Sequence, residues 1–165
     1  MATLHFICGK AASGKTTLAR RLATQHRAAL FIEEEWLTLL GAEIVSLADY
    51  GRHCARLRAA LVPHAIRLLE IGTSIVFDFA GNTPKERAWV RGIFERAGAD
   101  HMLHVIVASD DLCKARLRQR NATKPEGLYY GTVSEARFDE VTRYFVLPSE
   151  QENFRMTRYE ADPQV

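Results

Sequence analysis

Short apolar runs alternate along this chain with longer segments that have the periodicity of amphipathic helices. Five runs have the length and composition of buried strands, at 3–8, 28–32, 73–78, 102–108 and 153–159. Between the first two, Leu18 and Leu22 lie one helical turn apart, which predicts a helix from Lys15 to about Gln25. Strands that alternate with helices form a parallel sheet covered on both faces. We therefore expect a three-layer α/β/α fold with about five parallel strands.

Polar residues mark where the later helices begin. Four segments carry N-cap signals: Ser46-x-x-Asp49, Thr83-Pro84-x-Glu86, Ser109 and Thr132-x-x-Glu135. Their side-chain oxygens can accept hydrogen bonds from the free N–H groups of a first helical turn. Pro63 lies inside the helix that begins near Ser46, and we expect it to kink or divide that helix. The turn-forming residues at 121–132 predict a loop.

Three polar segments directly follow predicted strands. They are the glycine-containing loop at 9–17, the three glutamates at 33–35, and Asp78 at the end of its strand. Ligands of parallel α/β sheets bind beyond the carboxyl ends of the strands. We therefore expect all three segments to converge at one edge of the sheet.

The loop at 9–17 reads GKAASGKTT and contains a full Walker A motif, Gly9-x-x-x-x-Gly14-Lys15-Thr16. In this motif the glycines let backbone N–H groups turn inward around phosphate oxygens. The predicted nucleotide-binding residues are Gly9, Ala11, Ala12, Ser13, Gly14, Lys15, Thr16 and Thr17. Lys15 would reach the terminal phosphates and Thr16 would ligate Mg²⁺.

Asp78 is the second candidate for the metal site. It ends an apolar strand, where burying a carboxylate without a partner is costly. A Mg²⁺ ion reached through water is one partner, which would make Thr16 and Asp78 the metal-binding pair. A helix N-terminus or an arginine is the alternative.

The glutamates at 33–35 could supply a base that accepts a proton from an acceptor hydroxyl. If the second strand continues to residue 34, Glu34 lies on one face, and Glu33 and Glu35 share the other. A solvated acidic run that caps the next helix is the alternative interpretation.

Arg116 and Arg120 are spaced i,i+4, so they share one helix face, and they lead into a loop that contains glycines. Arginines in this arrangement are typical of a kinase lid, which brings them to a phosphoryl group and excludes water. We place this lid at about 116–137. The alternative is a solvated basic helix end, which the helix dipole favours.

Length and charge narrow the class of protein. The 165 residues predict one domain spanning 1–165, and the net charge of +2 does not indicate nucleic-acid binding. Three widely spaced cysteines fit buried thiols in a reducing cytosol better than disulfides or zinc. No apolar run has the length of a membrane span, and no signal peptide is evident, so we expect a cytoplasmic protein.

Within the P-loop proteins, the motifs favour a small kinase. Asp78-x-x-Gly81 matches the GTPase switch motif, but a following N/T-K-x-D guanine motif is missing. An LSGGQ-like transporter signature is also missing, and the chain is short for an ATPase module with a helical lid domain.

Several segments resemble small bacterial AAA-type ATP-binding proteins, close to zeta toxin, chloramphenicol phosphotransferase and polynucleotide-kinase-like P-loop kinases. They include ICGKAASGKTTLARRLA, FIEEEWLTLLG and CKARLRQRN. The resemblance implies a nucleoside-kinase-like P-loop fold, ATP-Mg²⁺ as phosphate donor, a carboxylate base after the second strand and lid arginines after the fourth. The family usually has an aspartate in the acidic run, which corresponds to Glu34; the choice among Glu33, Glu34 and Glu35 stays open.

These expectations together predict an ATP-dependent phosphotransferase. Its catalytic residues would be Lys15, Glu34, Arg116 and Arg120, and its acceptor would be the hydroxyl of a small polar metabolite, antibiotic or nucleotide-sugar. A 5′-hydroxyl polynucleotide kinase and a non-transferring ATP-dependent switch that acts on a partner protein are the alternatives.

Overall fold

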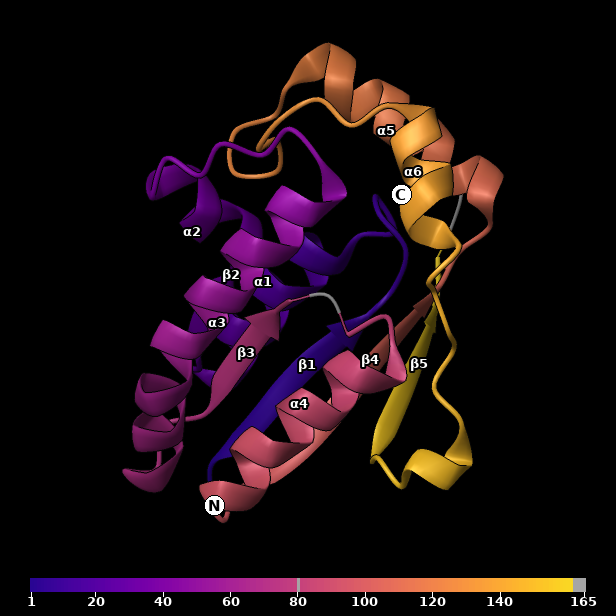
Figure 1. The fold of residues 1–165 in the computed structure, drawn as a ribbon. Coiled ribbons are helices and arrows are strands. Elements are labelled where there is room, and N and C mark those ends of the chain that lie inside the picture. The colour runs from indigo at the N-terminus through magenta and orange to yellow at the C-terminus, as the bar shows by residue number, and fades with distance from the viewer. Residues whose placement is uncertain (80, 162–165) are drawn as a thin grey trace.

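Five parallel strands form one sheet with the order β2-β3-β1-β4-β5 (Figure 1). The computed structural model describes residues 1–79 and 81–161. The strands are β1 (Thr3–Cys8), β2 (Ala29–Ile32), β3 (Ile75–Asp78), β4 (Asp100–Val107) and β5 (Met156–Glu160). All five predicted strands are therefore present, and the last begins three residues later than its apolar run suggested.

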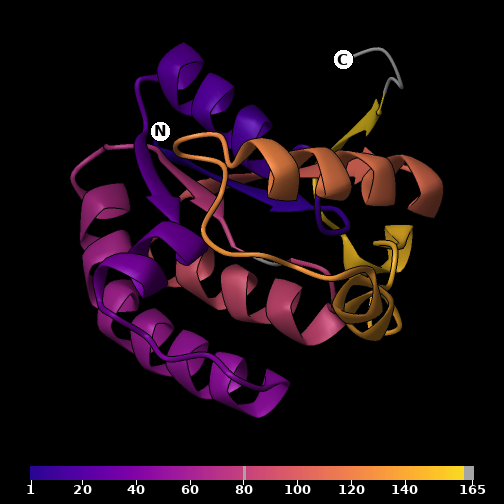
Figure 2. The same cartoon turned by 90° about the horizontal axis from the view of Figure 1, so that it is seen from above.

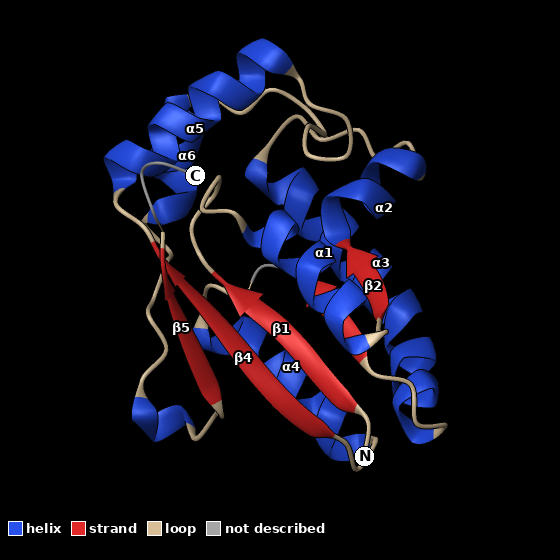
Figure 3. Ribbon diagram, turned by 180° about the vertical axis from the view of Figure 1, so that it is seen from behind, coloured by secondary structure: helices blue, strands red, loops and turns tan. Residues whose placement is uncertain are grey.

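Helices cover both faces of this sheet, which confirms the predicted three-layer architecture. They are α1 (Lys15–His26), α2 (Glu33–Leu39), α3 (Leu47–Glu70), α4 (Pro84–Arg96), α5 (Asp110–Thr123) and α6 (Glu135–Thr142). Figure 2 shows α3 and α4 on one side of the sheet and α1 on the other. Figure 3, from behind, shows α1 in front of the sheet beside β2, and α1 also packs against β3. No helix among the described residues is long and apolar enough to cross a membrane.

Alternation along the central strand explains the two-sided core. In β1, Leu4 and Phe6 pack into the cluster beneath α3 and α4, whereas Ile7 packs with Leu18 and Leu22 of α1. Because successive side chains of a strand point to opposite faces, one short apolar strand supplies both layers. The thiols of the three cysteines, Cys8, Cys54 and Cys113, are buried and free, as predicted.

The predicted N-cap residues are confirmed at three of the four helices. Capping boxes begin α3 at Ser46 and α4 at Thr83, and the Ser109 hydroxyl accepts from the N–H of Leu112 in α5. The fourth was wrong by two residues, because Ser134 rather than Thr132 caps α6. The helix α3 also runs unbroken through Pro63, so this proline does not divide it.

Strand register brings the two acidic segments together. Ile32, the last residue of β2, is aligned with Asp78, the last residue of β3. Glu33 therefore begins α2 at the same level of the sheet as the Asp78 carboxylate. The loop between β1 and α1 follows the strand next to β3, so the predicted convergence at one edge is present.

Candidate functional site

The loop from Gly9 to Gly14 has the backbone of a phosphate-binding loop. Ala12 (φ 57°) and Gly14 (φ 105°) both adopt left-handed conformations, which turn the chain sharply between β1 and α1. Gly14 is the N-cap of α1, and no side chain among the described residues caps it. The first N–H groups of α1, from Lys15, Thr16 and Thr17, therefore remain available to an anion.

Two further contacts define the loop. The Lys15 ammonium donates to the Lys10 carbonyl oxygen at 2.9 Å, so it lies against the loop itself. The Ser13 hydroxyl is buried and has no hydrogen-bond partner in the described part of the chain. A buried polar group without a partner is costly, and a bound phosphate would supply one.

Thr16 and Asp78 lie in direct contact, as expected for two groups that share a metal site. The Thr16 hydroxyl donates to Asp78 Oδ2 at 2.5 Å. Asp78 is 8% exposed, and burial raises the pKa of its carboxyl, while the Lys15 charge and the Thr16 hydrogen bond act in the opposite direction. The two residues therefore lie together as predicted, and their role as metal ligands stays a prediction.

The three glutamates do not continue the second strand, so the predicted alternation of their side chains was wrong. Glu33, Glu34 and Glu35 form the first turn of α2, which begins directly after β2. Three acidic residues in a first turn favour the helix electrostatically. Their side chains therefore fan out around a helix axis and have three different environments.

Glu33 is buried and takes part in an ion pair. Its carboxylate is 2% exposed and accepts two hydrogen bonds from Arg58, at 2.6 and 3.0 Å. The Tyr50 hydroxyl donates to the same carboxylate at 3.3 Å. A carboxylate with all these donors is poorly suited to accept a proton from a substrate.

Glu34 is exposed to solvent, yet it lies within reach of the charged groups of the site. Protein atoms surround its carboxyl closely enough that desolvation raises its pKa, although water still reaches the side chain. The charges of Lys15 and Arg120 lower this pKa, and those of Asp78 and Glu33 raise it. An accessible carboxylate with a raised pKa has the properties of a general base.

Arg116 and Arg120 both face the site from α5. The Arg116 guanidinium donates to the Ser13 carbonyl oxygen at 3.3 Å, directly on the phosphate-binding loop. The Arg120 charge acts on Glu34, and its buried Nε has no hydrogen-bond partner among residues 1–79 and 81–161. Arg116 therefore contacts the loop, and Arg120 is half-buried within electrostatic range of Glu34; their role as lid arginines stays a prediction.

The segment that carries these arginines is attached at both ends. At its start, the Lys10 ammonium pairs with Asp110 at 2.5 Å. At its far end, the N–H of Val146 donates to the Asn82 carbonyl oxygen at 2.8 Å. Figure 1 shows α5 and α6 at the edge of the sheet toward which the strands point.

Sequence reasoning missed Asn82 and Arg20. The Asn82 side-chain oxygen accepts from the N–H of Gly9 at 2.9 Å, which fixes the first residue of the phosphate-binding loop. Arg20, on α1, donates to the Gly127 carbonyl oxygen at 2.8 Å and so holds the loop between α5 and α6. The only available signal was that both lie close in sequence to recognised motifs.

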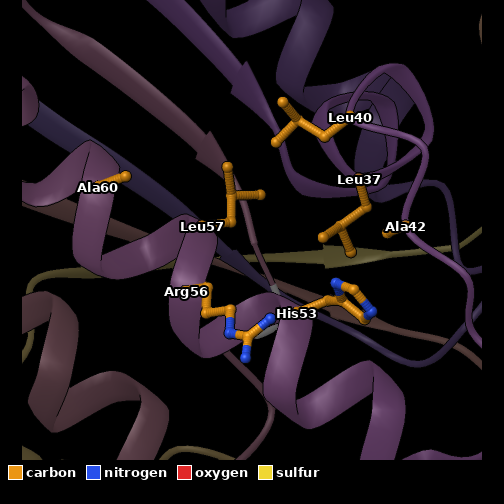
Figure 4. Close-up of a pocket in the computed structure, with 7 residues that line it drawn as sticks. All are labelled: Leu37, Leu40, Ala42, His53, Arg56, Leu57 and Ala60. Atoms are coloured by element: carbon orange, nitrogen blue, oxygen red, sulfur yellow. The ribbon is translucent and has the colours of Figure 1, made fainter.

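A separate cavity of about 240 Å³ lies between α2 and α3 (Figure 4). Its lining is mostly apolar, with two basic side chains: Leu37, Leu40, Ala42, His53, Arg56, Leu57 and Ala60. None of these residues belongs to the predicted site. The cavity therefore adds nothing to the chemistry described above.

Comparisons with solved structures identify the fold. A proposed kinase from Chloroflexus aurantiacus superposes with a TM-score of 0.73 and 21% sequence identity, covering 96% of this chain and 85% of its own. Kti12 from Chaetomium thermophilum, in complex with ADP-AlF3, superposes with a TM-score of 0.71 and 14% sequence identity. The match covers 96% of this chain and 89% of Kti12. A gluconokinase from Sinorhizobium meliloti superposes with a TM-score of 0.60 and 10% sequence identity, and the match covers 97% of this chain and 82% of the gluconokinase.

The amino-acid sequence of this chain matches the model of one protein family. The AAA domain family model matches residues 4–148, which include the phosphate-binding loop, the glutamates and both arginines. A comparison with curated proteins finds no match. The chain therefore belongs to the AAA domain family and has the fold of the small P-loop kinases.

Proposed function

We propose that this protein transfers the γ-phosphate of ATP to a hydroxyl group of a small polar molecule. The observation that carries the proposal is the 2.5 Å contact of Thr16 with Asp78 at the start of α1, with Glu34 electrostatically coupled to Asp78, Lys15 and Arg120. A nucleotide-binding loop alone would not need a base. An accessible carboxylate and two arginines at that loop are the groups that phosphoryl transfer requires.

The donor set fits ATP with Mg²⁺. The free N–H groups of the first turn of α1 and the unpaired Ser13 hydroxyl suit phosphate oxygens. The Thr16 hydroxyl and Asp78 carboxylate are oxygen ligands of the kind that Mg²⁺ prefers, Asp78 through water. When bound there, Mg²⁺ would neutralise charge on the β- and γ-phosphates.

In this proposal Glu34 is the general base. Its carboxylate would accept the proton of the acceptor hydroxyl as the oxygen attacks the γ-phosphorus. The raised pKa makes this carboxylate a stronger base than an ordinary glutamate, and its exposure leaves room for an acceptor. Glu33 is excluded from the role by its pairing with Arg58.

Arg116 and Arg120 would act as lid arginines on a segment of about 116–137. Their charges would stabilise the negative charge that spreads over the equatorial oxygens of the transferring group. The contact of Arg116 with the Ser13 carbonyl oxygen places its guanidinium at the loop that would hold the phosphates. Lys15 would turn from the Lys10 carbonyl oxygen to the terminal phosphates.

Proteins of similar structure support a small-molecule acceptor. Besides the gluconokinase, a sugar kinase from Janibacter sp. (TM-score 0.63) and an APS kinase from Mycobacterium tuberculosis (TM-score 0.52) share this fold. The net charge of +2 does not favour a polynucleotide. A polynucleotide kinase and a non-transferring switch remain the competing functions, and a transfer assay separates them.

The experiment is a transfer screen with ATP labelled on its γ-phosphate. Nucleosides, nucleotide-sugars, sugars, aminoglycosides, chloramphenicol and 5′-hydroxyl RNA are offered to the wild type and to Glu34→Gln. A labelled small-molecule product that the variant does not form supports the proposal. Label on RNA alone favours the polynucleotide kinase. Hydrolysis of ATP that no acceptor stimulates, in both proteins, favours the switch.

A further inference from the structure

A line of polar contacts joins the phosphate-binding loop to the first turn of α2. It begins at Gly9, whose N–H donates to the side chain of Asn82 at 2.9 Å. The N–H of Asn82 donates in turn to Glu86 Oε2 at 3.0 Å. The other oxygen of Glu86 lies 3.7 Å from Arg58, which holds Glu33. The line thus reaches the residue next to Glu34.

Arg58 is tightly enclosed along this line. Its side chain is 16% exposed, and its guanidinium lies over the ring of Trp89 at 5.1 Å and that of Phe79 at 5.9 Å. The fork of an arginine fits the two oxygens of Glu33 in a way that a lysine cannot reproduce. The pair therefore has one well-defined geometry.

Such a pair is a poor means of stabilising a fold. Removing two charges from water costs several kcal/mol, so an apolar pair of similar volume is often as stable or more so. What a buried ion pair does supply is a fixed position and a defined charge. Both properties matter to Glu34, because its pKa responds to the charge of Glu33.

We propose that Arg58 and Glu33 are positioning residues for Glu34. Their ion pair fixes the first turn of α2 and cancels the negative charge of the residue that precedes Glu34, and Glu86 and Asn82 tie this turn to the phosphate-binding loop. The proposal rests on the proposed function only in taking Glu34 as the base. The effect on Glu34 itself is measurable without a known acceptor.

The test is a titration of the Glu34 carboxyl, followed by its ¹³C NMR signal and assigned with Glu34→Gln. In Arg58→Met the uncompensated charge of Glu33 should raise the pKa of Glu34. In Glu33→Gln the loss of that charge, with Arg58 now unpaired, should lower it. We expect each shift to be on the order of half to one pH unit. The double variant should return the pKa close to the wild-type value.

Controls separate positioning from folding. Arg67→Met, which removes an exposed arginine of the same helix, should leave the Glu34 pKa unchanged. Arg58→Lys, which keeps the charge, should shift it less than Arg58→Met. Thermal unfolding confirms that each variant is folded; if Arg58→Met is not, Glu33→Gln and Arg58→Lys carry the test.

Shifts of opposite sign support the proposal, because a merely structural role would not produce them. An unchanged Glu34 pKa, or shifts of the same sign in Arg58→Met and Glu33→Gln, overturns it. Failure of the proposed function would look different: Glu34→Gln would then transfer phosphate at full rate, whatever the titration shows.

Discussion

The Thr16 hydroxyl and the Asp78 carboxylate form a 2.5 Å hydrogen bond across 62 positions of sequence. The contact joins the first turn of α1 to the end of β3 and holds two oxygen ligands together at the phosphate-binding loop. An aspartate in this position needs a proton donor or a cation to offset its burial. Thr16 is the donor in the structure, and we expect a bound metal to share the role.

Asp78→Asn should therefore remove most of the effect of Mg²⁺ on ATP binding. Calorimetric titration with ATP, with and without Mg²⁺, measures the difference. The wild type should bind ATP more tightly with the metal, and the variant should bind about equally in both conditions. Asp111→Asn, an exposed change on α5, is the matched control. A full metal effect in Asp78→Asn would contradict the assignment.

Lys15→Ala should leave the fold intact and abolish productive ATP binding. The half-buried Lys15 side chain donates to a loop carbonyl oxygen and is not part of the hydrophobic core, so we expect the fold to survive its removal. Circular dichroism and nucleotide titration test the two halves of this prediction. The control is Lys85→Ala, an exposed lysine in the first turn of α4. Unchanged ATP affinity and turnover in Lys15→Ala would rule out the phosphate-binding role.

Arg116→Ala and Arg120→Ala should each lower the transfer rate more than the ATP affinity. The charge that these arginines would meet develops in the transition state, and removing one such donor costs on the order of 10²–10³-fold in rate. Single-turnover transfer to the acceptor found in the screen gives the rate. Arg118→Ala, on the exposed side of the same helix, should have little effect. Near-wild-type transfer rates in both variants would contradict the assignment of these two residues as lid arginines.

Glu34→Gln should keep ATP bound but lose transfer, because an amide cannot accept the hydroxyl proton. Glu34→Asp should retain substantial activity, since it keeps a carboxylate on a side chain that is one methylene shorter. Glu35→Gln should have a small effect. Glu33→Gln, by contrast, should lower the rate through its loss of the Arg58 pairing. Single-turnover transfer compares the four variants, and a full-speed Glu34→Gln enzyme would move the role to another residue.

Three histidines form a cluster on the α1 side of the sheet, in which His5 and His104 are buried and His26 is exposed. His5 Nδ1 lies 3.0 Å from His104 Nε2, and the ring of His26 stacks on His5 at 4.4 Å. The Tyr159 hydroxyl lies 2.8 Å from His104 Nδ1. Burial, and then the neighbouring rings, lower the pKa values of His5 and His104 to about 4.

This cluster should make the fold sensitive to mild acid. An unfolded histidine titrates near pH 6.5, so between about pH 6.5 and 4 the unfolded chain binds more protons than the folded one. As the pH is lowered through this range, the free energy of unfolding should fall by about 1.4 kcal/mol per pH unit for each of the two imidazoles. Denaturant unfolding at several pH values measures the slope. His104→Gln should flatten it, and exposed His64→Gln should not; equal slopes in all three proteins would contradict the prediction.

Much of the site could be predicted because each segment follows a strand. The Walker A motif, Asp78 and the arginine pair needed only local sequence and the rule that parallel strands end at one edge. What failed was the boundary at Glu33. Three glutamates after an apolar run are compatible with a continued strand, whereas β2 ends at Ile32, level with Asp78, and α2 begins at Glu33.

Long-range pairing could not be predicted at all. Glu33 and Arg58 are 25 positions apart, and nothing in the spacing selects Arg58 over Arg52 or Arg56. Asn82 was passed over for the same reason, since its partner Gly9 lies 73 positions away. Such choices depend on how α3 and α4 lie against the sheet, which periodicity does not specify.

The two attachments of the α5–α6 segment lie at its two ends, so a lid formed by this segment would turn about the line that joins them. The line runs from Asp110 to Val146, and Cys113, Leu117 and Phe138 pack the two helices into one rigid piece. Along α5, Arg116 lies about 9 Å and Arg120 about 15 Å from the Asp110 end. For one angle of rotation Arg120 would travel farther than Arg116, so we expect Arg116 to stay nearer the loop, and opening would break the contact of Arg20 with Gly127.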